Sequence, residues 1–219
     1  MHGDNISKGV EVFSALVWPA LRQNSYLFSG YSELIHVEGD QSRVSQHIDR
    51  LGGIDYFVLV DKHLIPIASK IQQGGRDWET FTVRQRREGS EFVEGDIMLS
   101  RPYDAIGPYW TVQAYTDDWR ELVCIYVAKS EYILDRYIAG DYYPREYPDP
   151  DTGERITFAP IRVDSIKRNV LIGEVAYMKY DPEPYPIGTW RLIKGTKRDD
   201  QSISNTVNIQ MSLFGSSRS

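Results

Sequence analysis

The sequence predicts an α/β (α+β) fold in which a central mixed β-sheet is flanked by helices. Apolar, β-rich runs recur along the chain, and the strongest pair covers 54–60 and 64–72. Helical periodicity marks the N-terminal region and 130–138. With 219 residues, 41% of them hydrophobic, the chain can bury a real core in one domain or in one domain plus a small appendage.

The first predicted element is an amphipathic helix around 10–22. Its apolar residues recur at i, i+3, i+4, i+7 and i+8, and they are Phe13, Leu16, Val17, Ala20 and Leu21. Pro19 must kink this helix or start a second one, because proline lacks a backbone donor. Glu11 lies off the apolar stripe, either as a solvated residue or as an acid that points at a site.

A hairpin is predicted at the centre of the chain. A short strand at 31–37 and a polar loop with a helical turn at 40–50 precede it. Gly52 and Gly53 then lead into the runs 54–60 and 64–72, which are joined by a short polar break. This arrangement puts Asp55 on the first strand and Lys70 on the second.

Further elements follow in a meander. We predict a half-buried strand at 80–84, a short helix at 90–100, a second hairpin made of 109–116 and 121–127, and a helix at 130–138. A Tyr-, Pro- and Asp-rich stretch at 140–154 predicts a long loop or a boundary. Strand-like runs at 155–159, 170–178 and 188–193 then form either an appended β-subdomain or a continuation of the sheet. The expected units are a core at 1–139, an appended β region at 140–194 and a flexible tail at 195–219.

Composition limits the classes of partner. The formal net charge of −6 means that contact with nucleic acid requires a local basic patch. The densest candidate comprises Arg76, Arg84, Arg86 and Arg87, and a solvated strand end is the alternative. Cys124, the only cysteine, lies in an apolar run, which excludes a disulfide framework and cysteine-ligated zinc. No apolar run is long enough for a membrane helix and the N-terminus has no signal-peptide pattern, so we expect a cytoplasmic protein without a membrane partner.

An acid and a lysine on adjacent central strands resemble the PD-(D/E)xK nuclease superfamily, over residues 10–127. The family core is a helix, a three-strand meander, a second helix and a further strand, so the resemblance implies a restriction-endonuclease-like core. It also implies Mg²⁺ as cofactor, with Asp55 as a metal ligand and Lys70 orienting the attacking water or stabilising the phosphorane charge. Without the resemblance, Asp55 is a strand-edge acid after a Gly-Gly turn and Lys70 a solvent-facing strand residue.

The sequence departs from the family at Ala68, where an acid or glutamine would stand two residues before the lysine. Another oxygen ligand is then needed for Mg²⁺. The candidates are Glu11, Glu33, Glu79, Glu91, Glu94 and the neutral oxygen of Gln72.

A second motif lies near the end of the chain. The segment Gln210-Met211-Ser212-Leu213-Phe214 resembles the bacterial sliding-clamp-binding motif. Leu213 and Phe214 would fill an apolar pocket of the clamp, supported by Met211, while Gln210 bonds at its rim. The alternative is a final β-strand at 207–211 that ends in a Leu-Phe anchor on the core.

These patterns predict a DNA-processing protein recruited to the sliding clamp, acting as a Mg²⁺-dependent phosphodiesterase on DNA. Clamp tethering would raise the effective concentration of an acidic protein at DNA. The alternative is a catalytically inactive protein of the same fold, of phage or mobile-element origin, that binds the clamp or inhibits a host replication or defence component. A small-molecule enzyme lacks support, because the four histidines show no metal-ligand spacing and no Gly-x-Ser-x-Gly turn is present.

Overall fold

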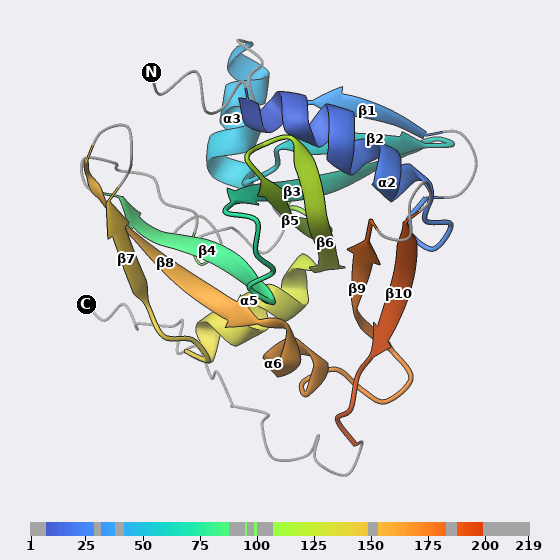
Figure 1. Cartoon of the computed structure of the whole chain (residues 1–219). Coiled ribbons are helices and arrows are strands. Elements are labelled where there is room, and N and C mark those ends of the chain that lie inside the picture. The colour runs from blue at the N-terminus through green and yellow to red at the C-terminus, as the bar shows by residue number, and fades with distance from the viewer. Residues whose placement is uncertain are drawn as a thin grey trace, which may run out of the picture.

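The computed structural model of the chain describes residues 8–28, 32–37, 42–87, 95, 99, 107–148, 153–182 and 188–198. Within these ranges the strands form a seven-stranded sheet and a three-stranded sheet (Figure 1). The large sheet has the order β1-β2-β3-β5-β6-β9-β10, and the small sheet has the order β4-β8-β7. The predicted mixed α+β class with a central mixed sheet is therefore confirmed.

The large sheet contains both predicted hairpins. Its strands are β1 (Ser32–His36), β2 (Tyr56–Val60), β3 (His63–Gln73), β5 (Trp110–Asp117), β6 (Glu121–Lys129), β9 (Val175–Asp181) and β10 (Thr189–Lys194). β3 and β5 are parallel and the other pairs are antiparallel. The turn between β2 and β3 is two residues long, and Asp61 takes a positive φ of 54° there. β9 and β10 extend this sheet, so the last part of the region after 139 continues it.

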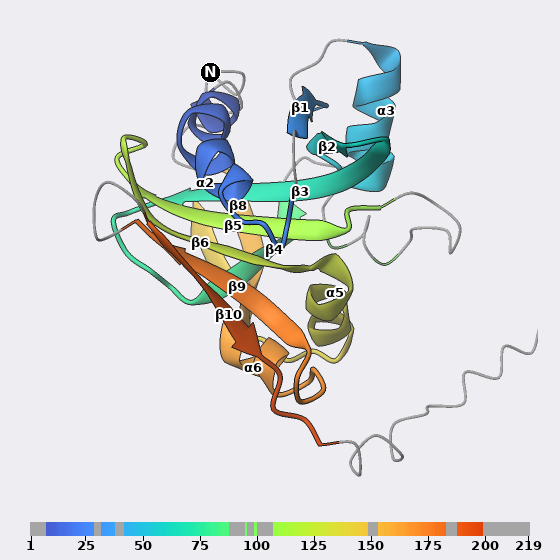
Figure 2. The ribbon, with the colours of Figure 1, turned by 90° about the vertical axis from the view of Figure 1, so that its right-hand side faces the viewer.

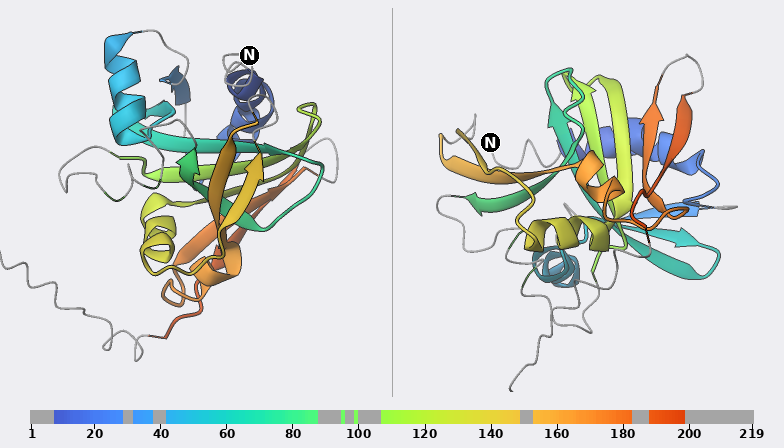
Figure 3. Two further views of the ribbon diagram at one scale, coloured as in Figure 1. Left: turned by 90° about the vertical axis from the view of Figure 1, so that its left-hand side faces the viewer. Right: turned by 90° about the horizontal axis from the view of Figure 1, so that it is seen from below.

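The third strand of the predicted meander does not join the large sheet. β4 (Thr80–Arg87) pairs instead with β8 (Arg155–Arg162), which pairs with β7 (Arg145–Pro148). This small sheet crosses the strands of the large sheet at a steep angle (Figure 3). The segment 74–79 carries the chain from one sheet to the other, and β5 takes the place beside β3.

The N-terminal helical segment covers one face of the large sheet (Figure 2). Residues 8–22 are helical and include a π-helical turn, η1 (Phe13–Val17), followed by α2 (Trp18–Arg22) with Pro19 in its first turn. The Trp18 amide donates to the Phe13 carbonyl, so the turn widens immediately before the proline. The Phe13 ring stacks on Tyr56 at a centroid distance of 4.1 Å.

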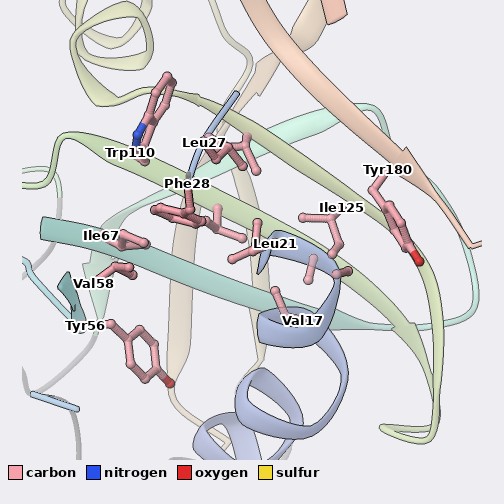
Figure 4. Packing of buried hydrophobic residues seen from close by; sticks show 14 of the residues in the cluster. Val17, Leu21, Leu27, Phe28, Tyr56, Val58, Ile67, Trp110, Ile125 and Tyr180 are labelled. Atoms are coloured by element: carbon pink, nitrogen blue, oxygen red, sulfur yellow. The ribbon is translucent and has the colours of Figure 1, made fainter. Parts of the chain in front are cut away.

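The buried side chains between this helical segment and the sheet form the first core (Figure 4). The helix contributes Phe13, Val17, Ala20 and Leu21, and the sheet contributes Tyr56, Val58, Ile67, Trp110, Ile125 and Tyr180. Each large apolar side chain buried here stabilises the fold by about 2 kcal/mol. Four of the five residues of the predicted apolar stripe thus face this core, while Leu16 is only partly buried.

A second core lies on the opposite face of the large sheet. Here the small sheet, α5 (Ser130–Ile138) and α6 (Val163–Lys167) cover inward side chains of β5, β6 and β9. Phe81 and Val83 of β4 pack in this core with Tyr126 of β6. α5 has the bounds that the sequence predicted.

Two loop predictions are wrong. The 40–50 segment contains α3 (Arg43–Gly52), because the Ser42 hydroxyl accepts from the Ser45 amide at its start and Gly53 closes its end at φ 62°. The 140–154 stretch contains β7, because β8 supplies a partner for its backbone. None of the described helices has the length and apolar character needed to cross a membrane. The predicted clamp-binding segment lies outside the described residues, as does the predicted 90–100 helix apart from 95 and 99, which are helical.

Candidate active site

One row of polar side chains runs across the large sheet, on the face that is turned toward the small sheet. The strand register places Lys70 beside Gln113, Gln113 beside Tyr126, Tyr126 beside Lys179, and Lys179 beside Arg191. Side chains that are directly paired point to the same face. Five strands therefore contribute to this row, and two groups of contacts form on it.

Asp55 lies immediately before β2, beside the middle of β3. Its amide donates to the Ile67 carbonyl, and its carboxylate accepts a hydrogen bond from the Ser69 amide. The side chain of Asp55 thus takes the place of a main-chain acceptor where β2 begins. This contact holds the carboxylate next to the residue that precedes Lys70.

Lys70 reaches from β3 to the small sheet. Its Nζ donates to the Thr82 carbonyl at 3.2 Å and lies 6.0 Å from the centre of the Phe158 ring. Lys70 is partly buried, so it is not the solvent-facing strand residue that is expected without the family resemblance. The ammonium is therefore placed at the seam between the two sheets.

Amide side chains complete this group, the Lys70 cluster, which comprises Lys70, Gln72, Thr82 and Gln113. The Gln113 side-chain carbonyl accepts from the Thr82 amide at 3.1 Å and from the Thr82 hydroxyl at 2.8 Å. The Gln72 amide donates to the same hydroxyl at 3.2 Å. Gln113 is only 1% exposed, so these bonds satisfy polar groups that water does not reach.

A second group, the Asp77 cluster, comprises Asp77, Tyr126 and Lys179. Lys179 Nζ lies 2.7 Å from the Asp77 carboxylate, and the Tyr126 hydroxyl donates to that carboxylate at 2.7 Å. The Glu79 amide donates to Asp77 at 2.9 Å. These bonds tie the 74–79 crossover to β6 and β9. An ion network continues outward, since Lys179 lies 3.4 Å from Asp181, and Asp181 pairs with Arg191.

The charges in the Asp77 cluster stabilise one another. Burial acts to raise the pKa of Asp77, but hydrogen bonds from Lys179 and Tyr126 outweigh it, so the pKa lies below its usual value. Burial acts to lower the pKa of Lys179, and the Asp77 carboxylate raises it above its usual value. Burial and the same carboxylate raise the pKa of the Tyr126 hydroxyl. Asp77 is thus ionised, Lys179 protonated and Tyr126 neutral near pH 7.

The predicted metal ligands are distributed around the fold. Glu33 is paired with Leu59, four residues along β2 from Asp55, which corresponds to about 13 Å. Glu79 is exposed and lies three residues, or about 10 Å, before Thr82 on the chain. Glu11 is exposed on the helical segment that covers the other face of the sheet. The predicted ligands Glu91 and Glu94 lie outside the described residues.

Within the described residues, no group of three or more His, Cys, Asp or Glu side chains is arranged to hold a metal ion. Mg²⁺ is often held by one or two carboxylates together with waters and substrate phosphates. A carboxylate offers about four lone-pair sites, and the Ser69 amide uses one of those on Asp55. The Asp55 carboxylate is of the ligand type that this mode of Mg²⁺ binding uses.

The predicted basic patch is divided between the two ends of β4. Arg76 lies in the crossover before the strand, with its guanidinium 4.6 Å from the Trp78 ring centre. Arg84, Arg86 and Arg87 lie at the far end of β4, where Arg84 is paired with Phe158. The structure therefore brings Arg84, but not Arg76, near the side of the seam that Lys70 reaches.

Sequence reasoning missed the Asp77 cluster. Asp77 reads as a turn residue, and Lys179 lies in an alternating strand whose neighbours Met178 and Tyr180 are buried. The available signal in the sequence was Lys179, which alternation places on the face of β9 opposite Met178 and Tyr180. In the fold, a second layer covers that face as well. No protein-family model, curated protein or solved structure matches the chain.

Proposed function

We propose that the protein is a DNA-processing phosphodiesterase that uses Mg²⁺, built on a restriction-endonuclease-like core. Asp55 would hold the metal ion, and Lys70 would act beside it at the seam between the sheets. The observation that supports this proposal is the bond from the Ser69 amide to the Asp55 carboxylate, which holds the acid beside the residue that precedes Lys70. Mg²⁺ would supply charge neutralisation at the scissile phosphate.

The chain itself would contribute positioning and charge. Asp55 is fixed by two hydrogen bonds to β3, so its carboxylate needs little reorganisation on binding. The Lys70 ammonium has three donors, one of which is directed at the Thr82 carbonyl. This hydrogen bond fixes the ammonium at the seam, where it would stabilise the charge of the phosphate that is attacked.

A cleavage assay with Mg²⁺ on single-stranded and duplex DNA tests this proposal. Asp55→Asn and Lys70→Met should each lower the cleavage rate about a hundredfold or more, as expected for groups that act in the reaction. Asp61→Asn and Lys62→Met, in the turn of the same hairpin, are matched controls and should retain activity. Cleavage that is unchanged by the Asp55 and Lys70 substitutions would overturn the assignment.

We also propose recruitment by the bacterial sliding clamp through Gln210, Met211, Leu213 and Phe214. The support is the match of residues 210–214 to the motif. The test is a binding titration of purified clamp against the intact chain and a Leu213→Ala, Phe214→Ala variant, with Ser216→Ala, Ser217→Ala as control. Loss of binding in the first variant alone supports recruitment, and no binding by the intact chain rejects it without affecting the cleavage proposal.

The second candidate is a catalytically inactive protein of this fold, of phage or mobile-element origin, that binds the clamp or inhibits a host replication or defence component. Two observations favour it: Ala68 stands where the family carries an acid, and the Lys70 ammonium already donates to a main-chain carbonyl. An intact chain that binds clamp or DNA but cleaves no nucleic acid would select this candidate.

A further inference from the structure

Three side chains form a row across the small sheet. Arg84 of β4 is paired with Phe158 of β8, and Phe158 is paired with Arg145 of β7. Directly paired residues share a face, and neighbouring strands are about 4.8 Å apart. The two arginines are therefore the cross-strand neighbours of Phe158 on the same face, although Arg145 lies far from Arg84 in the sequence.

This row faces the seam between the sheets. Thr82 lies two residues before Arg84 on β4, so the two side chains share a face, and the Thr82 hydroxyl contacts Gln113 of the large sheet. From the other side of the seam, Lys70 Nζ lies 6.0 Å from the Phe158 ring centre. Lys70 thus lies over a half-buried ring whose cross-strand neighbours are two arginines.

The row carries positively charged side chains, although the formal net charge of the whole chain is −6. Arg145 is exposed on the edge strand β7. The next residue, Glu146, points to the opposite face of the strand and lies 3.7 Å from Arg155. Glu146, the acid next to Arg145 on this strand, is therefore directed away from the row.

We propose that Lys70, Arg84 and Arg145 bind the phosphodiester backbone of a nucleic acid, with Phe158 as the support between them. This surface, the seam row, rests on the proposed function and deepens it, because it leads the substrate backbone to Lys70. Phosphate oxygens match guanidinium and ammonium donors. The Phe158 ring carries Lys70 at its face and is half-buried, so it supports the cations rather than stacking a base.

The test is an anisotropy titration of labelled duplex DNA, single-stranded DNA and RNA, without Mg²⁺, between about 50 and about 200 mM salt. Arg145→Gln should weaken binding roughly tenfold at the lowest salt. It should also reduce the slope of log affinity against log salt by about 0.9 on duplex DNA or about 0.7 on a single strand. The matched control is Arg120→Gln, which makes the same charge change in the exposed β5–β6 turn and should alter affinity less than about twofold.

The results separate the seam row from the proposed function. Binding that depends on Arg145 supports the seam row even if the chain cleaves nothing, and the nucleic acid that is bound most tightly identifies the substrate. Equal effects of Arg145→Gln and Arg120→Gln would overturn the seam row, and would leave a cleavage activity that depends on Asp55 intact. Absence of binding to all three nucleic acids, or displacement by polyglutamate as effective as by unlabelled nucleic acid, would also overturn it.

Discussion

The Lys70 cluster and the Asp77 cluster lie on the same row of the large sheet but are held by different forces. The Lys70 cluster consists of hydrogen bonds among amides, a hydroxyl and main-chain carbonyls. The Asp77 cluster is an ion pair with a tyrosine as third partner. In the Lys70 cluster, the contacts orient the Lys70 ammonium at the seam. In the Asp77 cluster, the Asp77 carboxylate neutralises the Lys179 ammonium. The comparison indicates that the Asp77 cluster anchors the 74–79 crossover to β6 and β9, while the Lys70 cluster joins β4 to the large sheet and fixes an ammonium there.

Breaking the Asp77 cluster should give the largest loss of stability. Asp77→Ala leaves Lys179 partly buried without its partner, so the free energy of unfolding should fall by about 3 kcal/mol. Urea denaturation followed by far-UV circular dichroism measures this change. Glu146→Ala, which removes an exposed ion pair, is the matched control and should cost less than about 1 kcal/mol. Equal effects of the two substitutions would mean that the Asp77 cluster does not anchor the crossover.

The effect of Asp77→Ala can also be measured locally, by amide hydrogen exchange in the 74–79 crossover. Because Asp77 ties 74–79 to β6 and β9, Asp77→Ala should increase amide hydrogen exchange most strongly in that segment. Exchange that increases uniformly over the whole chain would instead indicate a global loss of stability.

Removing the buried amide should have a smaller effect. Gln113→Leu keeps the side-chain volume but leaves the Thr82 amide and hydroxyl without this acceptor, which should cost about 2 kcal/mol. Gln72→Leu removes one bond to the same hydroxyl and should cost less than about 1 kcal/mol. If Gln113→Leu is as stable as the unaltered chain, the amide network does not hold β4 against the large sheet.

Acid titration should show the smallest effect. The pKa of Asp77 is lower in the folded chain than in the unfolded chain, so the unfolded state binds the proton more readily. The stabilisation is therefore complete above the unfolded value of about 3.9 and is lost as pH falls through the folded value. Denaturation from pH 7 down to acid conditions should show a steeper decline for the unaltered chain than for Asp77→Asn. Parallel curves for the two proteins would contradict this linkage.

Local patterns were sufficient for the elements that carry strong periodicity or clear turns. The 130–138 helix and the two hairpins formed as expected, because their apolar spacing and polar breaks specify them without distant partners. α3 was missed because the Ser42 cap and the Gly53 terminus outweigh a polar interior. β7 was missed because its strand conformation depends on β8, which no local pattern reports.

The sequence by itself determined the mixed α+β class and the central hairpin that carries Lys70. Only the tertiary structure decided that β4 leaves the large sheet, because pairing with β8 satisfies its backbone and Asp77 anchors the crossover. It also decided that Arg145 lies near Arg84. Contacts between residues distant in sequence depend on strand register, and register is fixed when faces are buried together rather than by any one segment.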